Sequence, residues 1–124
     1  MKKRTALFLS LALGISTIIF FVVAYKRADA AGNNAKAGRT VHINNCQRCH
    51  GPQGRGDGPA GQLLKTKPAN WADKGKMSRL SDDYLYKIIS GGGGATGKST
   101  LMPAFKGKLS DGQIWDVIAF IRSL

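Results

Sequence analysis

The chain has 124 residues and a formal net charge of +12 at pH 7, with two cysteines, two histidines and 43% hydrophobic residues. This length allows one ordinary domain at most. The basic residues are scattered and are not clustered with aromatic residues, which argues against a nucleic-acid-binding protein.

The first thirty residues carry a targeting or membrane segment. A basic start, Met1 to Arg4, precedes 21 residues, Thr5 to Tyr25, that are apolar apart from small and hydroxyl side chains. A secretory apolar region has about 7–15 residues and a membrane-spanning helix about 20, so the length favours an uncleaved anchor in the cytoplasmic membrane through residues 5–25. A cleaved signal is the alternative, because Ala28-Asp29-Ala30 fits a small-x-small cleavage site. Both place the rest of the chain on the periplasmic side.

Residues 31–124 form the predicted second domain. Its fourteen Lys and Arg and six Asp and Glu give a net charge of +8, which favours an acidic partner protein or an anionic membrane surface. Charge that merely keeps the domain soluble is the alternative. About 94 residues bury a core of marginal stability, so we expect a further element to stabilise it.

A helix is predicted over about Ala35 to Asn45, where Ala37 and Val41 share one face. Directly after it, Cys46-Gln47-Arg48-Cys49-His50 has the C-x-x-C-H pattern of covalent haem attachment. At this spacing each thiol adds to one of two neighbouring vinyl groups at a haem edge, and the adjoining imidazole reaches the iron. The motif therefore predicts one haem c held by Cys46, Cys49 and His50.

Other uses of the two cysteines remain open but fit less well. A zinc site needs four ligands, and the only other histidine, His42, does not supply a second ligand pair at finger-like spacing. A thioredoxin-like dithiol needs a strand before it, and no alternating β-branched run follows Ala31. A structural disulfide is the third alternative.

Residues 51–80 are rich in glycine and proline and predict turns, with one short helix near Ala60 to Lys65. A longer helix is predicted from Ser81, with Asp82 and Asp83 at the positive end of its dipole. Its inward face carries Leu85, Ile88 and Ile89, and the following glycine run ends it.

That glycine run belongs to Gly92 to Ser99, which matches the phosphate-binding pattern G-x-x-x-x-G-K-[ST]. A phosphate-binding loop needs a strand before it and a helix after it. Here a predicted helix precedes it and Pro103 follows soon after, which prevents a phosphate-binding helix. We therefore expect no nucleotide, and interpret the glycines as the end of a helix leading into the next loop.

The next loop contains Leu101-Met102-Pro103, and Met102 is the predicted sixth ligand of the haem iron. A methionine thioether is a soft neutral ligand that favours ferrous iron and raises the reduction potential. Pro103 fixes the local backbone, so the sulfur is presented from a loop of defined shape. Met77, His42 or no protein ligand are the alternatives, and a gap-filling or exposed side chain is the other interpretation of Met77.

The last helix is predicted from Ser110, which with Gln113 forms a capping box, to the end of the chain. Its apolar residues recur at helical spacing, with Trp115 and Phe120 widening the stripe. These positions are Ile114, Val117, Ile118 and Ile121.

From about Ala35 to Leu124 the chain resembles the class I cytochromes c, here of bacterial type. The resemblance rests on Gly38, the C-x-x-C-H motif, Pro59, Met102-Pro103 and the aromatic C-terminal helix. It implies an all-α fold, a small cytochrome c fold of three to five helices around one covalent haem c, preceded by the N-terminal apolar segment. It also implies that Gly38 lets the first and last helices cross closely, with Phe120 as its aromatic partner.

The resemblance further implies that the Pro59 carbonyl pairs with the second nitrogen of the ligand imidazole, which would orient the ring. The chain departs from the family at His42, where an aromatic residue is usual four residues before the first cysteine. His42 is expected to be a packed or partly exposed helix residue, with a redox-linked proton site as the alternative. Trp71 is expected to be a core or lid aromatic, or to lie near a haem propionate.

The function predicted from ligation is one-electron transfer between redox proteins, without catalysis on a substrate. Surface lysines would steer the carrier onto acidic docking faces of its partners. The alternatives are a cytochrome subunit of a larger membrane oxidoreductase, or a haem enzyme or gas-binding protein with a labile sixth ligand. The lysines proposed for docking are Lys65, Lys67, Lys98, Lys106 and Lys108.

Overall fold

The computed structural model describes residues 33–124, and within that range every regular element is a helix. The three long helices are α2 (Ala35–Asn45), α6 (Asp82–Gly91) and α7 (Asp111–Ser123). The short ones are α3 (Gln47–His50), α4 (Pro59–Gln62), α5 (Lys74–Met77) and the 3-10 helix η1 (Gly93–Thr96). The all-α prediction is thereby confirmed, and three single-turn helices bring the described α-helices to six.

The predicted signal or anchor, residues 1–30, lies outside the described residues. Among residues 33–124, no helix combines the length and the hydrophobicity needed to cross a membrane.

Helix α7 forms where local sequence signals predict it. The Ser110 hydroxyl accepts the backbone N–H of Gln113 at 3.2 Å, and the Gln113 side chain accepts the N–H of Ser110 at 2.9 Å. This capping box satisfies two backbone donors at the helix start. The predicted inward positions are all buried, with 1–2% of each side chain exposed, so this face forms the centre of the core. They are Ile114, Val117, Ile118 and Ile121.

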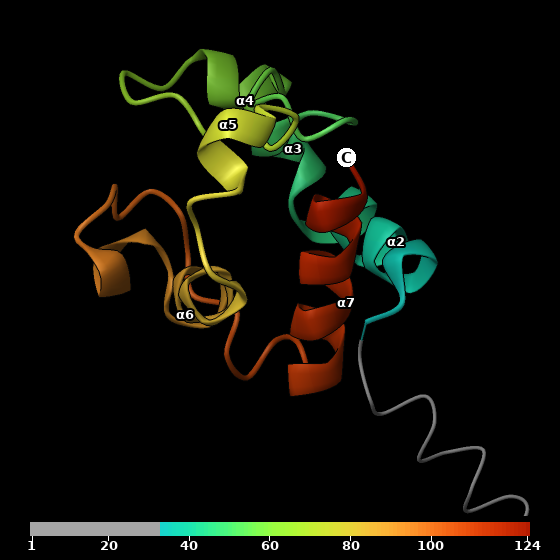
Figure 1. The fold of residues 1–124 in the computed structure, drawn as a ribbon. Helices are drawn as coiled ribbons and strands as arrows, with labels where there is room; N and C mark the ends of the chain where they lie inside the picture. The colour runs from blue at the N-terminus through green and yellow to red at the C-terminus, as the bar shows by residue number, and fades with distance from the viewer. Residues whose placement is uncertain (1–32) are drawn as a thin grey trace, which may run out of the picture. The chain divides into compact units, whose positions relative to one another are not determined.

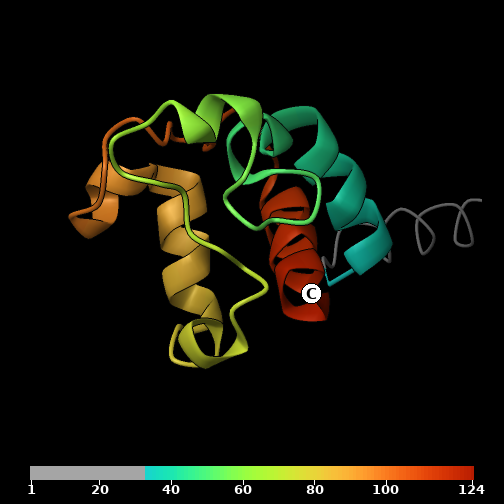
Figure 2. The ribbon, with the colours of Figure 1, turned by 90° about the horizontal axis from the view of Figure 1, so that it is seen from above.

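Helices α2 and α7 cross in close contact, side by side in both views of the fold (Figure 1, Figure 2). A Cβ added to Gly38 in α2 would lie 1.8 Å from the backbone oxygen of Asp116 in α7. Only glycine therefore allows this backbone approach. The contact at Gly38 is made by the backbone of Asp116 and Val117. The ring of Phe120, expected to be the aromatic partner of Gly38, lies against His42 instead.

The start of α2 is tied to the same crossing by a buried carboxylate. Asp116, only 8% exposed, accepts the backbone N–H of Asn34 at 2.8 Å. The Asn34 side chain in turn accepts the N–H groups of Lys36 and Ala37, both at 3.1 Å, as an N-cap. The first free donors of α2 are thus satisfied by its own cap and by α7.

Helix α6 lies on the other side of α7 from α2 in both views (Figure 1, Figure 2). Ser81 caps it by accepting the N–H of Tyr84 at 3.1 Å, as predicted, and Leu85 and Ile89 are buried in the core. Gly92 ends the helix with φ of +76°, a left-handed conformation that glycine adopts at no steric cost.

The short helix predicted near residues 60–65 forms slightly earlier, as α4, because Pro59 takes its first position. The single turns α3 and α5 were not predicted. In α5 the Asp73 carboxylate accepts the N–H of Lys76 at 3.1 Å, but the turn has no apolar periodicity that would reveal it.

Candidate functional site

The C-x-x-C-H motif folds as one compact turn at the junction of α2 and α3. The carbonyl of Cys46 accepts the backbone N–H of Cys49 at 3.1 Å and of His50 at 2.9 Å. Both thiols are free and half-buried, so the structure contains no disulfide between them. Burial, with a smaller contribution from Cys49, raises the pKa of the Cys46 thiol to about 11, which keeps it protonated at neutral pH.

Helix α4 packs directly against this turn through two glycines. A Cβ on Gly58 would lie 2.5 Å from the carbonyl oxygen of Arg48, and one on Gly61 would lie 2.1 Å from that of Cys49. Pro59, between them, occupies the first turn of α4, where its missing N–H costs nothing. The motif is therefore held between α2 and a short helix whose glycines permit backbone contact.

His50 is half-buried, and its imidazole stacks on Trp71 with ring centroids 4.1 Å apart and an interplanar angle of 22°. Burial lowers the pKa of His50 to about 4, although the backbone of Ala69 partly opposes the shift. The ring is therefore neutral at pH 7, which is the form that binds metals.

The Nδ1 atom of His50 is buried and has no hydrogen-bond partner among residues 33–124. The bond expected from the Pro59 carbonyl is thus not formed here, and the role of Pro59 remains a prediction. Trp71 is 6% exposed, which confirms the expectation of a core aromatic and adds its stacking on His50.

Met102 lies half-buried in a loop whose backbone is bonded to the start of η1 at the methionine and to the end of α6 beyond it. The carbonyl of Met102 accepts the N–H of Gly93 at 3.1 Å. Beyond the methionine, the carbonyl of Ser90 accepts the N–H groups of Phe105 at 3.1 Å and Lys106 at 3.0 Å. These bonds satisfy carbonyls at the end of α6 and fix the loop that carries the thioether.

The glycine run permits this contact by lacking side chains. A Cβ on Gly92 would lie 2.8 Å from the Met102 carbonyl oxygen, and one on Gly93 would lie 2.0 Å from that of Ser99. The run is preceded by α6 and followed by turns, so it lacks the strand and helix of a phosphate-binding loop. The interpretation of these glycines as the approach to the Met102 loop is confirmed by this geometry.

The two residues considered as alternative sixth ligands, Met77 and His42, are both buried. Met77 is 5% exposed and packs in the hydrophobic core, which matches the gap-filling interpretation. His42 is fully buried, and its Nε2 is 2.8 Å from the carbonyl oxygen of Gly51. Burial lowers its pKa, with the Gly51 hydrogen bond opposing and Arg39 adding to the shift.

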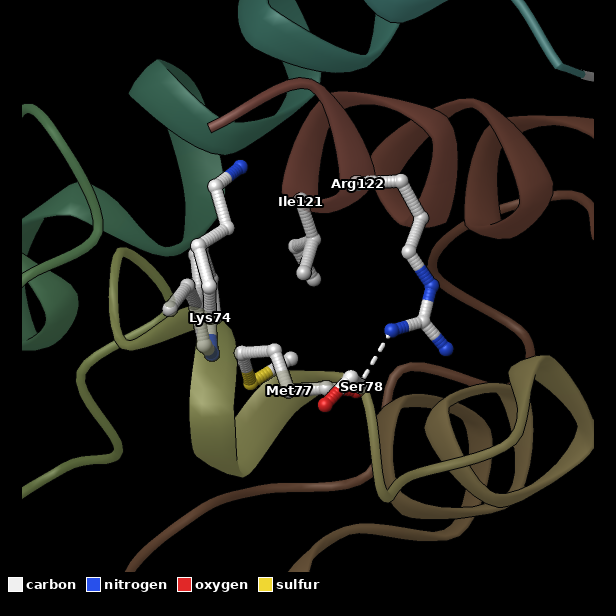
Figure 3. Close-up of a pocket in the computed structure, with 6 residues that line it drawn as sticks. Lys74, Met77, Ser78, Ile121 and Arg122 are labelled. Atoms are coloured by element: carbon white, nitrogen blue, oxygen red, sulfur yellow. Dashed lines mark hydrogen bonds between the residues drawn. The ribbon is translucent and has the colours of Figure 1, made fainter.

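A pocket of about 220 Å³ opens between α5 and the end of α7 (Figure 3). Its lining is mostly apolar, and Trp71 links it to His50. The guanidinium of Arg122 donates to the carbonyl of Met77 at 2.7 Å and pairs with Asp82, so it fastens α7 to α5 and α6. The lining residues are Trp71, Lys74, Met77, Ser78, Ile121 and Arg122.

The residues present fit a covalently attached haem. Two free thiols and a neutral imidazole lie on one turn, and the Nδ1 atom of that imidazole is buried with no partner in the described part of the chain. Two thiols and an adjoining neutral imidazole are the donor set that covalent haem attachment uses. Met102 supplies a thioether from a separate, hydrogen-bonded loop.

Comparisons with known proteins agree with this arrangement. The family model for cytochrome c matches residues 35–124. The chain is 34% identical over 125 residues to cytochrome c6 of a Picosynechococcus species, covering 98% of this chain and 92% of that protein. It is 30% identical over 96 residues to a gluconate 2-dehydrogenase cytochrome c subunit of Pantoea cypripedii, and 28% identical over 90 residues to a cbb3-type cytochrome c oxidase subunit of Rhizobium leguminosarum. Each of these two matches covers 73% of this chain but only 20% and 28% of the respective relative.

Proposed function

From the premise that this chain belongs to the cytochrome c family, and is an electron-transfer protein with covalent haem c, we propose a His/Met-ligated one-electron carrier. In this proposal Cys46 and Cys49 form the two thioether bonds, and His50 and Met102 are the axial ligands. The carrier works between redox proteins on the outer face of the cytoplasmic membrane.

The haem supplies the chemistry, a reversible one-electron change of its iron, and the protein sets the conditions for it. The neutral imidazole of His50 and the soft thioether of Met102 would fill both axial positions, which leaves no site for a substrate. The turn held by α4 and the loop held by α6 would keep both ligands in place during the electron change.

The observation that carries the proposal is the pair of preorganised ligand segments. One is the C-x-x-C-H turn, closed by hydrogen bonds to Cys46, and the other is the Met102 loop, closed by hydrogen bonds to η1 and to the end of α6. The Met102 side chain is only half-buried, whereas Met77 and His42, at 5% and 0% exposed, are enclosed by the core. This difference favours Met102 as the sixth ligand.

Electrostatic docking is tested by making the same change in net charge at two different places on the surface. Lys98 and Lys106 flank Met102 in sequence and are exposed, as are Lys36 and Arg39 on α2. We expect the double variant K98E/K106E to slow oxidation by ferricyanide, a small anionic oxidant, about tenfold or more at low salt. The matched variant K36E/R39E, with the same change in net charge, should lose less.

Stopped-flow rates measured from low to high ionic strength check this prediction. Salt should reduce the difference, because the screening length falls from about 10 Å at 0.1 M to about 3 Å at 1 M. Equal losses in the two double variants, or rates that do not respond to salt, would remove docking around Met102 from the proposal.

An anchored carrier is proposed from the length of the apolar segment. A subunit of a larger oxidoreductase is the second candidate, because two relatives are named as an oxidase subunit and a dehydrogenase subunit. We expect haem-stained chain to stay with the membranes after carbonate extraction, and release into the supernatant would indicate a cleaved signal. After mild detergent, a native gel should show the haem at monomer mass, whereas a larger assembly would support the subunit.

A further inference from the structure

His42 occupies the centre of the helix crossing and has an environment that packing alone does not require. It is 0% exposed, with Phe120 of α7 on one side at a centroid distance of 5.1 Å. Trp71 approaches it edge-on with ring centroids 5.3 Å apart, and Trp71 also stacks on the ring of His50. A continuous set of rings thus joins the C-terminal helix to the expected axial ligand.

His42 also makes one long-range polar contact. Its Nε2 lies 2.8 Å from the carbonyl oxygen of Gly51, the residue that directly follows His50. A carbonyl oxygen only accepts, so Nε2 carries the proton and donates it. The bond therefore ties the backbone after His50 to α2, the helix that leads into the C-x-x-C-H turn.

Gly51 has a backbone conformation that residues other than glycine rarely adopt. Its φ is +79°, a left-handed conformation, and a Cβ there would lie 1.8 Å from a carboxylate oxygen of Asp57. Its carbonyl also accepts the N–H of Gly54 at 3.1 Å, so that oxygen would keep a partner if His42 were replaced. The contact with His42 is thus an additional constraint on this turn.

The histidine carries a cost that a hydrocarbon ring would not. With the proton on Nε2, Nδ1 is an acceptor, and it is buried with no partner among the described residues. A buried unpaired acceptor is destabilising, whereas a phenyl ring would fill the crossing without one. Burial lowers the pKa of His42, consistent with a neutral ring that has a single N–H to donate.

We propose that His42 is a positioning residue, whose Nε2–H bond to the Gly51 carbonyl holds the backbone after His50 and so fixes the orientation of the axial imidazole. This inference rests on the ligation by His50 proposed above. Trp71, stacked on His50 and in edge contact with His42, holds the same ring from its face.

The test compares His42→Phe with His42→Gln in the haem-loaded protein. Phenylalanine keeps the aromatic packing and removes the donor, while glutamine keeps an N–H donor at the end of its side chain. In the ferric protein, the proton NMR signals of the haem methyl groups depend on the orientation of the axial imidazole plane. We expect H42F to change the spacing of these signals while its unfolding midpoint shifts by less than about 8 °C.

H42Q is expected to keep the wild-type pattern of methyl signals. Val117→Ala is the control, since Val117 is buried in the same crossing and has no polar group. It should lower the unfolding midpoint and leave the pattern unchanged. If H42Q does not fold, the comparison of H42F with V117A still decides the question.

An H42F protein with the wild-type methyl pattern would overturn the proposal, and so would a V117A protein altered as much as H42F. The wild-type spectrum separates this failure from failure of the proposed function. A high-spin wild type contradicts the ligation itself, whereas a low-spin wild type that H42F leaves unchanged contradicts only the role of His42.

Discussion

Replacing Met102 by alanine is expected to open the sixth coordination position while the haem stays attached, because Cys46 and Cys49 are untouched. The ferrous variant should bind carbon monoxide, which the wild type should not, since both axial positions are filled in the proposed state. Loss of the thioether should also lower the reduction potential by a sizeable part of the roughly 0.8 V range that axial ligands span. Carbon monoxide difference spectra and a redox titration measure both effects.

Met77→Ala is the matched control, because Met77 is the other methionine among the described residues and it is buried in the core. It should destabilise the fold by about 2–5 kcal/mol through the cavity it leaves, with no gain of carbon monoxide binding. If M77A binds carbon monoxide and M102A does not, the sixth ligand is Met77.

Replacing Gly38 by alanine should cause a large loss of stability, although it adds only one methyl group. The new Cβ would lie 1.8 Å from the Asp116 carbonyl oxygen, so α2 and α7 would have to separate. We expect the free energy of unfolding to fall by about 2–3 kcal/mol, even though alanine is favoured over glycine in a helix by about 1 kcal/mol. The unfolding midpoint should fall by at least about 8 °C.

Gly75→Ala in α5 provides the control for helix propensity. Its Cβ would meet only a carboxylate oxygen of Asp73, at an ordinary 3.5 Å. This variant should be neutral or more stable by up to about 1 kcal/mol. A G38A protein whose midpoint matches that of G75A would show that the crossing tolerates a side chain.

The helices that local signals predict are the ones whose ends carry caps. Ser110 with Gln113, and Ser81 with its following aspartates, place the starts of α7 and α6 because a capping side chain bonds to the backbone a few residues away. The single turn α5 has an Asp73 cap but no apolar repeat, so it could not be told from the surrounding turns.

The sequence predicts which residues make up the candidate site, but it does not predict the long-range contacts that hold them in place. The spacing of three residues between the cysteines, with histidine next, predicts haem attachment. The proline after Met102 indicates a loop of defined shape that could present a ligand. By contrast, the bond between His42 and Gly51, and the bonds of Arg122 to α5 and α6, join segments that meet only in the folded chain. No local pattern encodes such contacts.

The nucleotide-binding pattern shows that a short sequence motif can also match where the fold does not support its usual function. Gly92 to Ser99 match it letter for letter, yet Gly92 and Gly93 are needed because backbone atoms of the Met102 loop and of Ser99 lie where a Cβ would stand. A short run of glycines indicates that other atoms lie close to the backbone there. Whether those atoms belong to a phosphate or to another segment of the chain depends on the surrounding elements.

The optical spectrum of the purified ferric protein tests the central claim most directly. A covalent haem with His50 and Met102 as ligands predicts a low-spin spectrum that includes the methionine–iron charge-transfer band, with the haem remaining on the chain after denaturation. A high-spin ferric spectrum would contradict ligation by Met102, and with it the assignment of this chain as a His/Met-ligated electron carrier.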